Sequence, residues 1–241
     1  MQASTADQLL LLAVQAGDSH LDALARRART LPQLARIAAL DADLAALADP
    51  LATAELTVVE LGRDQRHAEG EVQAVRGRLD RDRARLDSGL GSAKDMQALS
   101  SGVAVELRRI AELEDAELVV MEALEEAVGT RDGLAARRAE LSAHLAMEQT
   151  SRDTELAALD AEVATARADR DALAARVPAD LLTLYGRVRA SSQGVGAAEL
   201  RGGRCLGCSL QLTAAERSRI AAAPATEVVR CEECDRILVR P

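Results

Sequence analysis

The residues best suited to chemistry are four cysteines, which all lie near the C-terminus. They form two Cys-x2-Cys pairs separated by residues 209–230. Two such pairs supply four thiolates, the ligand set of a tetrahedral structural Zn²⁺ site with no position left open for a substrate. Two disulfides in a secreted protein, or a redox dithiol, are the alternatives. We predict one structural zinc ion, bound by Cys205, Cys208, Cys231 and Cys234.

Nothing else in the sequence has the pattern of a catalytic site. The three histidines, His20, His67 and His144, are far apart, and none has a second histidine or a carboxylate at a spacing that stands out. Neither a P-loop nor a dinucleotide-binding fingerprint is present. We therefore predict a protein that is not an enzyme and has no small-molecule substrate.

The composition indicates long helices. The chain of 241 residues contains one aromatic residue, Tyr185, with no Phe and no Trp. A compact domain of this size normally buries several rings, whereas chains rich in Ala, Leu, Glu and Arg typically form coiled coils.

The net charge of −9 argues against a general polyanion binder. No apolar run could cross a bilayer, and residues 9–16 lack the basic start of a secretory signal, so we expect a cytoplasmic protein without membrane contact.

A heptad repeat begins at Ile37 and runs to Leu86, with apolar residues at alternating spacings of three and four. Residues 87–94 interrupt it, and Gly89 and Gly91 predict a turn. Apolar periodicity then resumes at Leu99 and continues to about residue 177. Two arms joined by a short turn predict an antiparallel hairpin, with an intermolecular coiled coil as the alternative. The predicted core positions of the first arm are Ile37, Leu40, Leu44, Leu47, Leu51, Ala54, Val58, Leu61, Gln65, Ala68, Val72, Val75, Leu79, Asp82 and Leu86.

The last part of the chain has a different pattern. Pro178 ends the second arm, and a short helix and a linker follow. Strands are predicted near residues 197–201, 227–230 and 237–239, and Thr213 with Glu216 predicts the start of a helix. The predicted fold class is mainly α, a long antiparallel coiled-coil hairpin plus a small C-terminal α+β zinc ribbon. The predicted domains are a hairpin over 1–177 with its turn near 88–94, a helix and linker over 178–196, and the ribbon over 197–241.

Several stretches together resemble a known family. They are residues 203–212 and 231–238 around the cysteines, 194–198 before them, and 92–99 and 113–122 near the turn. In these stretches the chain resembles the bacterial C4-type zinc-ribbon family that carries an N-terminal coiled-coil hairpin. The resemblance implies a helical hairpin with a compact zinc ribbon at its base. It also implies a scaffold or chaperone role like that of relatives in flagellar or secretion machinery, some of which bind nucleic acid.

The sequence favours a non-enzymatic adaptor or scaffold that uses its hairpin to bind an unidentified protein partner. The alternative is a nucleic-acid-binding protein whose ribbon arginines contact phosphates, although residues 197–241 carry seven arginines against six carboxylates. A further candidate contact lies at the hairpin tip, in Arg81, Arg83, Arg85 and Lys94. The candidate ribbon contacts are Arg201, Arg204, Arg217, Arg219, Arg230, Arg236 and Arg240.

Overall fold

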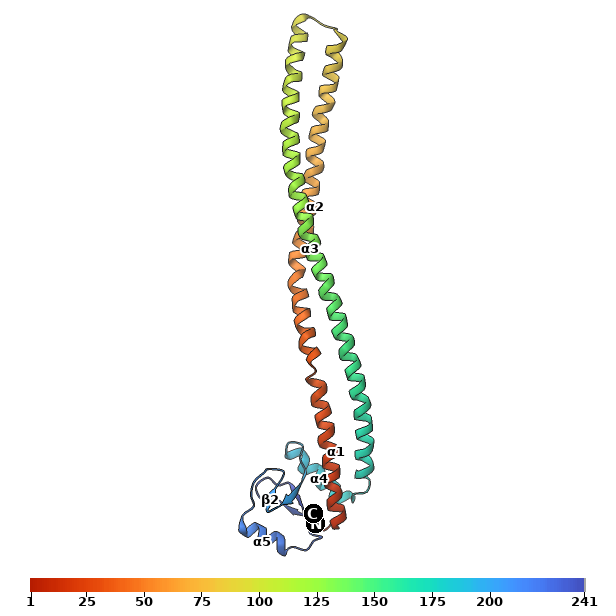
Figure 1. The fold of residues 1–241 in the computed structure, drawn as a ribbon, viewed down its shortest axis with the longest axis vertical. Helices are drawn as coiled ribbons and strands as arrows, with labels where there is room; N and C mark the ends of the chain where they lie inside the picture. The colour runs from red at the N-terminus through yellow and green to blue at the C-terminus, as the bar shows by residue number, and fades with distance from the viewer. Residues whose placement is uncertain (241) are drawn as a thin grey trace. The chain divides into compact units, whose positions relative to one another are not determined.

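The computed structural model describes residues 1–240, and most of them are helical, as the predicted fold class requires (Figure 1). Contacts within the chain group them into two units. Unit 1 contains Met1–Ala35 and the chain from Gln149 onward, and unit 2 contains Arg36–Glu148. The helices are α1 (Thr5–Arg29), α2 (Pro32–Ser88), α3 (Ala93–Ala174), α4 (Ala179–Ser191) and α5 (Ala214–Ala222), and the strands are β1 (Ala197–Arg201), β2 (Arg204–Cys205), β3 (Val229–Arg230) and β4 (Ile237–Val239).

Unit 2 is a hairpin in which α2 and α3 pair with each other within one chain (Figure 1). Every core position predicted between Ile37 and Leu86 is buried or partly buried, including Gln65 and Asp82. Near the turn, valine and leucine side chains of α2 pack against Ile110 and Leu113 of α3 in one buried cluster. The heptad positions of α2 are therefore used in the pairing of α2 with α3 within the hairpin.

The turn between the two helices uses the residues that the sequence singled out. Gly89 and Gly91 have φ angles of 62° and 143°, a region that residues with a Cβ rarely adopt. The hydroxyl of Ser92 accepts a hydrogen bond from the Asp95 amide at 3.2 Å, and the Asp95 carboxylate accepts one from the Ser92 amide at 3.1 Å. This reciprocal capping box begins α3.

In unit 1 a four-stranded sheet of order β2-β1-β4-β3 lies between two cores. The central strands β1 and β4 are parallel, and alternate residues along them serve opposite faces. Ala197 and Ile237 pack with Tyr185 and with apolar residues of α1 and α4. Their neighbours Ala198 and Leu238 pack with the cysteines and with α5. The ribbon and the base helices are thus joined through one sheet.

The predicted elements after Pro178 are confirmed, with one addition. The helix that begins with a hydrogen bond from the Glu216 amide to the Thr213 hydroxyl ends at Ala222, as expected. The short strand β2 was not predicted, because two residues leave no periodic pattern to detect. The domain boundaries predicted at 177 and 196 stay a prediction, since the contacts group the ends of the helical arms with the ribbon in unit 1.

A polar network around the single ring fixes the base of unit 1. The Tyr185 hydroxyl donates to Asp18 Oδ2 at 2.6 Å and lies 3.1 Å from Gln15 Oε1. The same Gln15 oxygen accepts the Gly196 amide at 2.7 Å, just before β1. Asp18 also accepts a hydrogen bond from Arg170 Nε at 2.9 Å, so its buried charge is paired. This network links α1, α3, α4 and the entry to the sheet.

Tyr185 should make the stability of unit 1 sensitive to alkali. Burial, together with the hydrogen bond to Asp18, raises the pKa of Tyr185 above its usual value of 10.0. In the unfolded chain the phenol ionises near about pH 10. The contribution of the neutral phenol is therefore complete below that pH and is lost as the pH rises toward the folded-state pKa. We expect the free energy of unfolding to fall above about pH 10, and phenolate absorbance to appear only on unfolding. A phenolate signal near pH 10 in the folded chain would contradict this.

Gly196 should be required for the close contact between β1 and the ring. A Cβ at this position would lie 2.8 Å from two ring carbons and from the carbonyl oxygen of Tyr185. We expect Gly196→Ala to destabilise unit 1 by about 1–3 kcal/mol in urea unfolding. Gly186→Ala is the matched control, because a Cβ in the middle of α4 meets nothing within 4 Å. The control should stabilise the protein by up to about 1 kcal/mol. Equal effects of the two substitutions would argue against the packing explanation.

Candidate metal centre

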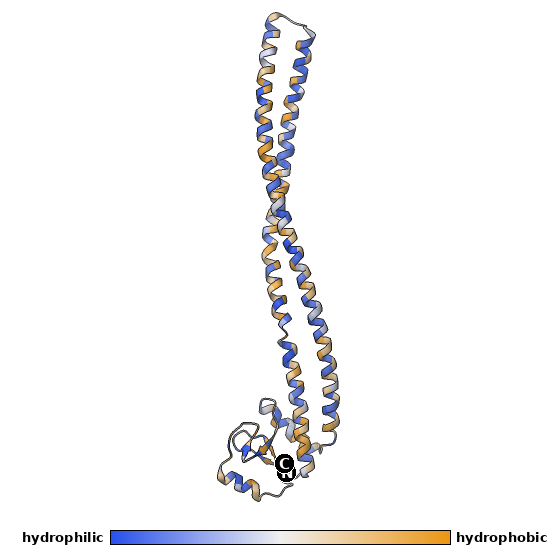
Figure 2. Cartoon of the chain, in the orientation of Figure 1, coloured by the Kyte–Doolittle hydropathy of each residue, from blue (hydrophilic) through white to orange (hydrophobic). Residues whose placement is uncertain are grey.

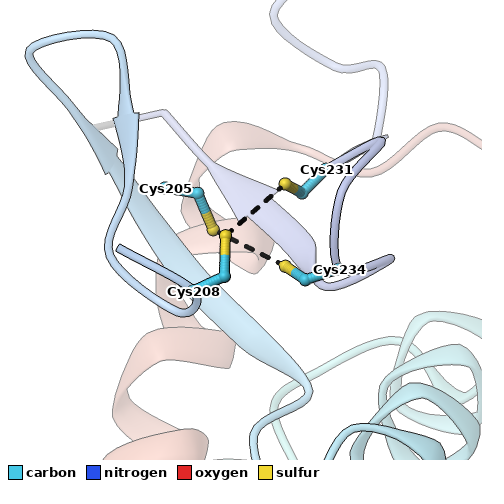
Figure 3. Close-up of side chains that lie close together, drawn as sticks. All are labelled: Cys205, Cys208, Cys231 and Cys234. Carbon is cyan, nitrogen blue, oxygen red and sulfur yellow. Dashed lines mark hydrogen bonds between the residues drawn. The ribbon is translucent and has the colours of Figure 1, made fainter. Parts of the chain in front are cut away.

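The four cysteine sulfurs converge on one point in unit 1 (Figure 3). Cys205 Sγ lies 3.8 Å from Cys234 Sγ, Cys208 Sγ lies 4.0 Å from Cys231 Sγ, and all four atoms lie within 4.8 Å of one another. A tetrahedron of thiolates around Zn²⁺, with bonds of about 2.3 Å, has edges of about 3.8 Å. The donor set and its spacing therefore fit one tetrahedral zinc ion. The sulfurs are free thiols and not disulfides.

The two loops that carry the cysteines have the same backbone geometry. In the first loop the Cys205 amide donates to the Leu210 carbonyl at 3.0 Å, and the Ser209 amide donates to the Cys205 carbonyl at 2.8 Å. In the second, the Cys231 amide donates to Arg236 at 2.9 Å, and the Asp235 amide donates to Cys231 at 2.9 Å. Each loop therefore turns back after its second cysteine, which directs both sulfurs of the pair inward.

Three backbone positions make these loops tight. Gly203 precedes the first loop with a φ of 74°. Ser209 and Asp235 occupy equivalent positions in the two loops, and both have left-handed φ angles of 62° and 61°. The sequence did not single them out, because serine rarely adopts this region, and aspartate, although enriched there, adopts it too seldom to predict it from residue type. Gly207 is needed for space, because a Cβ there would lie 2.6 Å from Arg236 Cδ.

The protonation of the thiols depends on how deeply each is buried. Burial raises the pKa of Cys205, and it raises the pKa of Cys231 to about 12. Burial also acts on Cys234, but hydrogen bonds from Arg236, Cys208 and Cys231 together outweigh it and lower the pKa of this thiol to about 7. Zinc binds thiolates, so binding must displace the protons that burial favours, and the zinc affinity should fall as the pH falls.

Most of the candidate ribbon arginines already have partners within the chain. Arg201 pairs with Glu199 through two hydrogen bonds of 2.6 Å, Arg219 pairs with Glu232, and Arg230 pairs with Asp235. Two others donate hydrogen bonds to backbone carbonyls. Arg236 donates to Val195 and Ser192 of the linker. Arg240 donates to carbonyls at the C-terminal end of α5 and in the segment after it. Among residues 1–240, only Arg204 and Arg217 of this set have side chains without such a partner.

The candidate tip residues lie in unit 2, on the last turns of α2 and the first turn of α3. Arg81, Arg83, Arg85 and Lys94 are all exposed. None of their side chains forms an ion pair or hydrogen bond within the described part of the chain. They are available for an external contact, and their role stays a prediction.

Two protein families match this architecture. The CT398-like coiled coil hairpin domain matches residues 14–193, and the C4-type zinc ribbon domain matches residues 204–238. The first match covers well over half of the chain, which therefore belongs to the CT398-like coiled-coil hairpin family and carries a C4-type zinc ribbon. The predicted resemblance is confirmed, and the ribbon with its clustered cysteines is that of a protein with one structural zinc ion.

Individual relatives are similar over their whole length. Rv2229c of Mycobacterium tuberculosis is 37% identical over 240 residues, covering 100% of this chain and 98% of the relative. ML1638 of Mycobacterium leprae is 29% identical over 234 residues, covering 91% and 94%. A solved structure from Mycobacterium smegmatis has a TM-score of 0.85 at 34% identity and covers 100% of both chains. CT398 from Chlamydia trachomatis has a TM-score of 0.66 at 15% identity, covers 98% of both chains and shares the fold.

The helices differ from membrane-spanning helices. Figure 2 shows hydrophilic and hydrophobic residues interspersed along α2 and α3. Within residues 1–240, no helix combines the length and the hydropathy needed to cross a bilayer.

Replacing one cysteine should remove the metal and unfold the ribbon. We expect the wild-type protein to hold one zinc ion per chain and Cys231→Ser to hold far less, because three thiolates rarely retain a structural zinc. Elemental analysis measures the zinc, and amide chemical shifts of the ribbon report its fold. The helices of unit 2 should keep their circular dichroism, since their heptad contacts do not involve the ribbon. Ser209→Gly is the control, because glycine accepts the left-handed φ of this position. Native ribbon shifts in metal-free Cys231→Ser would contradict the structural role of zinc.

Proposed function

We propose that the protein is a cytoplasmic adaptor that binds a protein partner through its zinc ribbon and presents it on a coiled-coil scaffold. Hairpin and ribbon families fit a non-enzymatic, scaffold-like role. In this proposal Cys205, Cys208, Cys231 and Cys234 hold the zinc ion, and four thiolates suit a reducing compartment. The observation that carries the proposal is a pair of exposed leucines on the first zinc loop, Leu206 and Leu210, with 46% and 49% of their surface accessible.

The zinc loop supports these leucines as a preorganised surface. Leu206 lies between the two cysteines of the first pair, and its amide donates to the Glu199 carbonyl at 3.0 Å. Leu210 follows Cys208, and its carbonyl accepts the Cys205 amide. A loop that is already ordered loses little conformational entropy on binding, which favours affinity. In this proposal the two side chains supply the apolar contacts that the centre of a protein interface needs.

The charges beside the leucines indicate the chemistry of the partner. Arg204 immediately precedes Cys205, and Arg217 lies against Gly203, where a Cβ would come within 2.7 Å of its side chain. Both arginines are exposed. Two exposed cations near the start of the first zinc loop favour a partner surface that is apolar with acidic residues at its edge.

Nucleic-acid binding is supported less well. It would rely on the same two arginines, because the other five candidates have partners in the chain. The chain has no Phe or Trp, and its one tyrosine, Tyr185, is buried at the base of unit 1, so no base could stack on it. A phosphate contact through Arg204 and Arg217 therefore remains the alternative outcome of the experiment below.

We expect a leucine double variant to lose its protein partner. Leu206→Ser with Leu210→Ser should abolish nuclease-resistant capture of partner proteins from cell extract, because it removes the apolar surface and leaves the zinc ligands in place. Arg204→Ala with Arg217→Ala is the matched variant; Arg204 lies in β2, just before the first zinc loop, and Arg217 lies on α5. Zinc content and circular dichroism should be unchanged in both, which separates binding from folding.

The pattern across the two variants distinguishes the functions. Loss of nuclease-resistant capture in the leucine variant, with a smaller loss in the arginine variant, supports the adaptor. The opposite pattern would support the nucleic-acid function in place of the adaptor. In that pattern, nuclease treatment abolishes the capture of partner proteins, and only the arginine variant loses binding of RNA or DNA.

A further inference from the structure

One face of α3 in unit 2 carries large apolar side chains that the hairpin does not use. Val105, Leu118 and Val119 have 54%, 55% and 66% of their surface exposed. The seam residues on the same stretch, Ile110 and Leu113, are buried against α2. With 3.6 residues per turn, the exposed positions share one face directed away from α2. We call this face the outer face of α3; its members are Ala104, Val105, Arg108, Ala111, Glu112, Asp115, Leu118 and Val119.

The outer face is complementary to itself when it is reversed. Its midpoint falls between Ala111 and Glu112, and the three outer pairs of positions at equal distances on either side match in chemistry, whereas the central pair sets Ala111 opposite Glu112. Val105 matches Leu118, Ala104 matches Val119, and Arg108 matches Asp115. If two copies of this helix lie antiparallel, apolar side chains meet apolar ones and each arginine meets an aspartate. An interface formed by the same patch on both subunits requires this kind of self-complementarity.

Two of the three charged members of the face, Arg108 and Asp115, lack partners within the chain. Arg108 and Asp115 are exposed, and neither side chain forms an ion pair or hydrogen bond with any residue in 1–240. Their neighbours differ: Arg109 pairs with Glu112, and Glu114 pairs with Arg76 across the hairpin. The face thus presents Arg108 and Asp115 as an unpaired cation and an unpaired anion. In an antiparallel pair of these helices, each of them lies opposite the other residue of the second copy.

We propose that the outer face of α3 is a homodimer interface, in which two hairpins pack antiparallel about a twofold axis between Ala111 and Glu112. Arg108 of each copy pairs with Asp115 of the other, and Val105 packs against Leu118 at both ends. A face of this length, about 23 Å along the helix, is short. The dimer is therefore weak, depends on protein concentration and is sensitive to salt. An adaptor with this dimer would present two ribbons.

Charge exchange in the full-length, zinc-loaded protein tests the interface. Sedimentation equilibrium over a range of concentrations should show a monomer–dimer equilibrium for the wild type. Arg108→Asp and Asp115→Arg should each weaken dimerisation by at least about tenfold, because each places like charges together twice in the dimer. The double variant that carries both changes should recover dimerisation, since the pairs are restored with reversed sign. Arg83→Asp is the control, with the same charge change at an exposed residue that also lacks a partner.

Three results would overturn the proposal. They are a protein that stays monomeric at all concentrations, single variants that dimerise as the wild type does, and a double variant that does not recover. All four variants should keep the wild-type circular dichroism, because the changed side chains are exposed on helices. The test does not involve the zinc loop, so it is independent of the adaptor proposal.

Discussion

The pairing of β1 with β4 is the interaction on which unit 1 depends. These two short parallel strands serve two cores at once, because successive side chains point to opposite faces of the sheet. Ala197 and Ile237 complete the core of the base helices, and Ala198 and Leu238 complete the core around the cysteines. A chain with one aromatic ring has little apolar area to bury in so small a domain. Zinc coordination supplies folding free energy that this core alone would lack.

The contacts of the ribbon arginines are the reason that our proposal favours a protein partner over nucleic acid. A count of charges in the sequence treats the ribbon arginines as free, but most of them form ion pairs or hydrogen bonds within the chain. Arg236 joins the second zinc loop to the linker, and Arg240 binds the carbonyls at the end of α5. The exposed surfaces on which our proposals rest include apolar side chains: two leucines on the zinc loop, and Val105, Leu118 and Val119 on the outer face of α3. Both are small surfaces on rigid elements, which suits selective and reversible association.

Much of the fold could be predicted from local pattern. The heptad positions of α2, the glycine turn, the helix N-caps at Ser92 and Thr213 and three of the four strands follow from the spacing of residue types. The four cysteines and their spacing likewise predicted the metal centre. The left-handed residues Ser209 and Asp235 escaped prediction, because the closure of a zinc loop imposes their conformation and their side chains do not favour it strongly. The short strand β2 escaped for a similar reason, since only its pairing with β1 defines it.

The sequence by itself therefore determined the helices, their pairing seam and the identity of the zinc-binding residues, because each depends on residue type at a fixed spacing along the chain. Tertiary structure decided which polar groups are used internally. It buried Tyr185 against Asp18 and Gln15 and committed five ribbon arginines. It also left Arg108 and Asp115 without partners on an exposed face. These outcomes depend on which segments distant in sequence meet in space, and no local spacing encodes them.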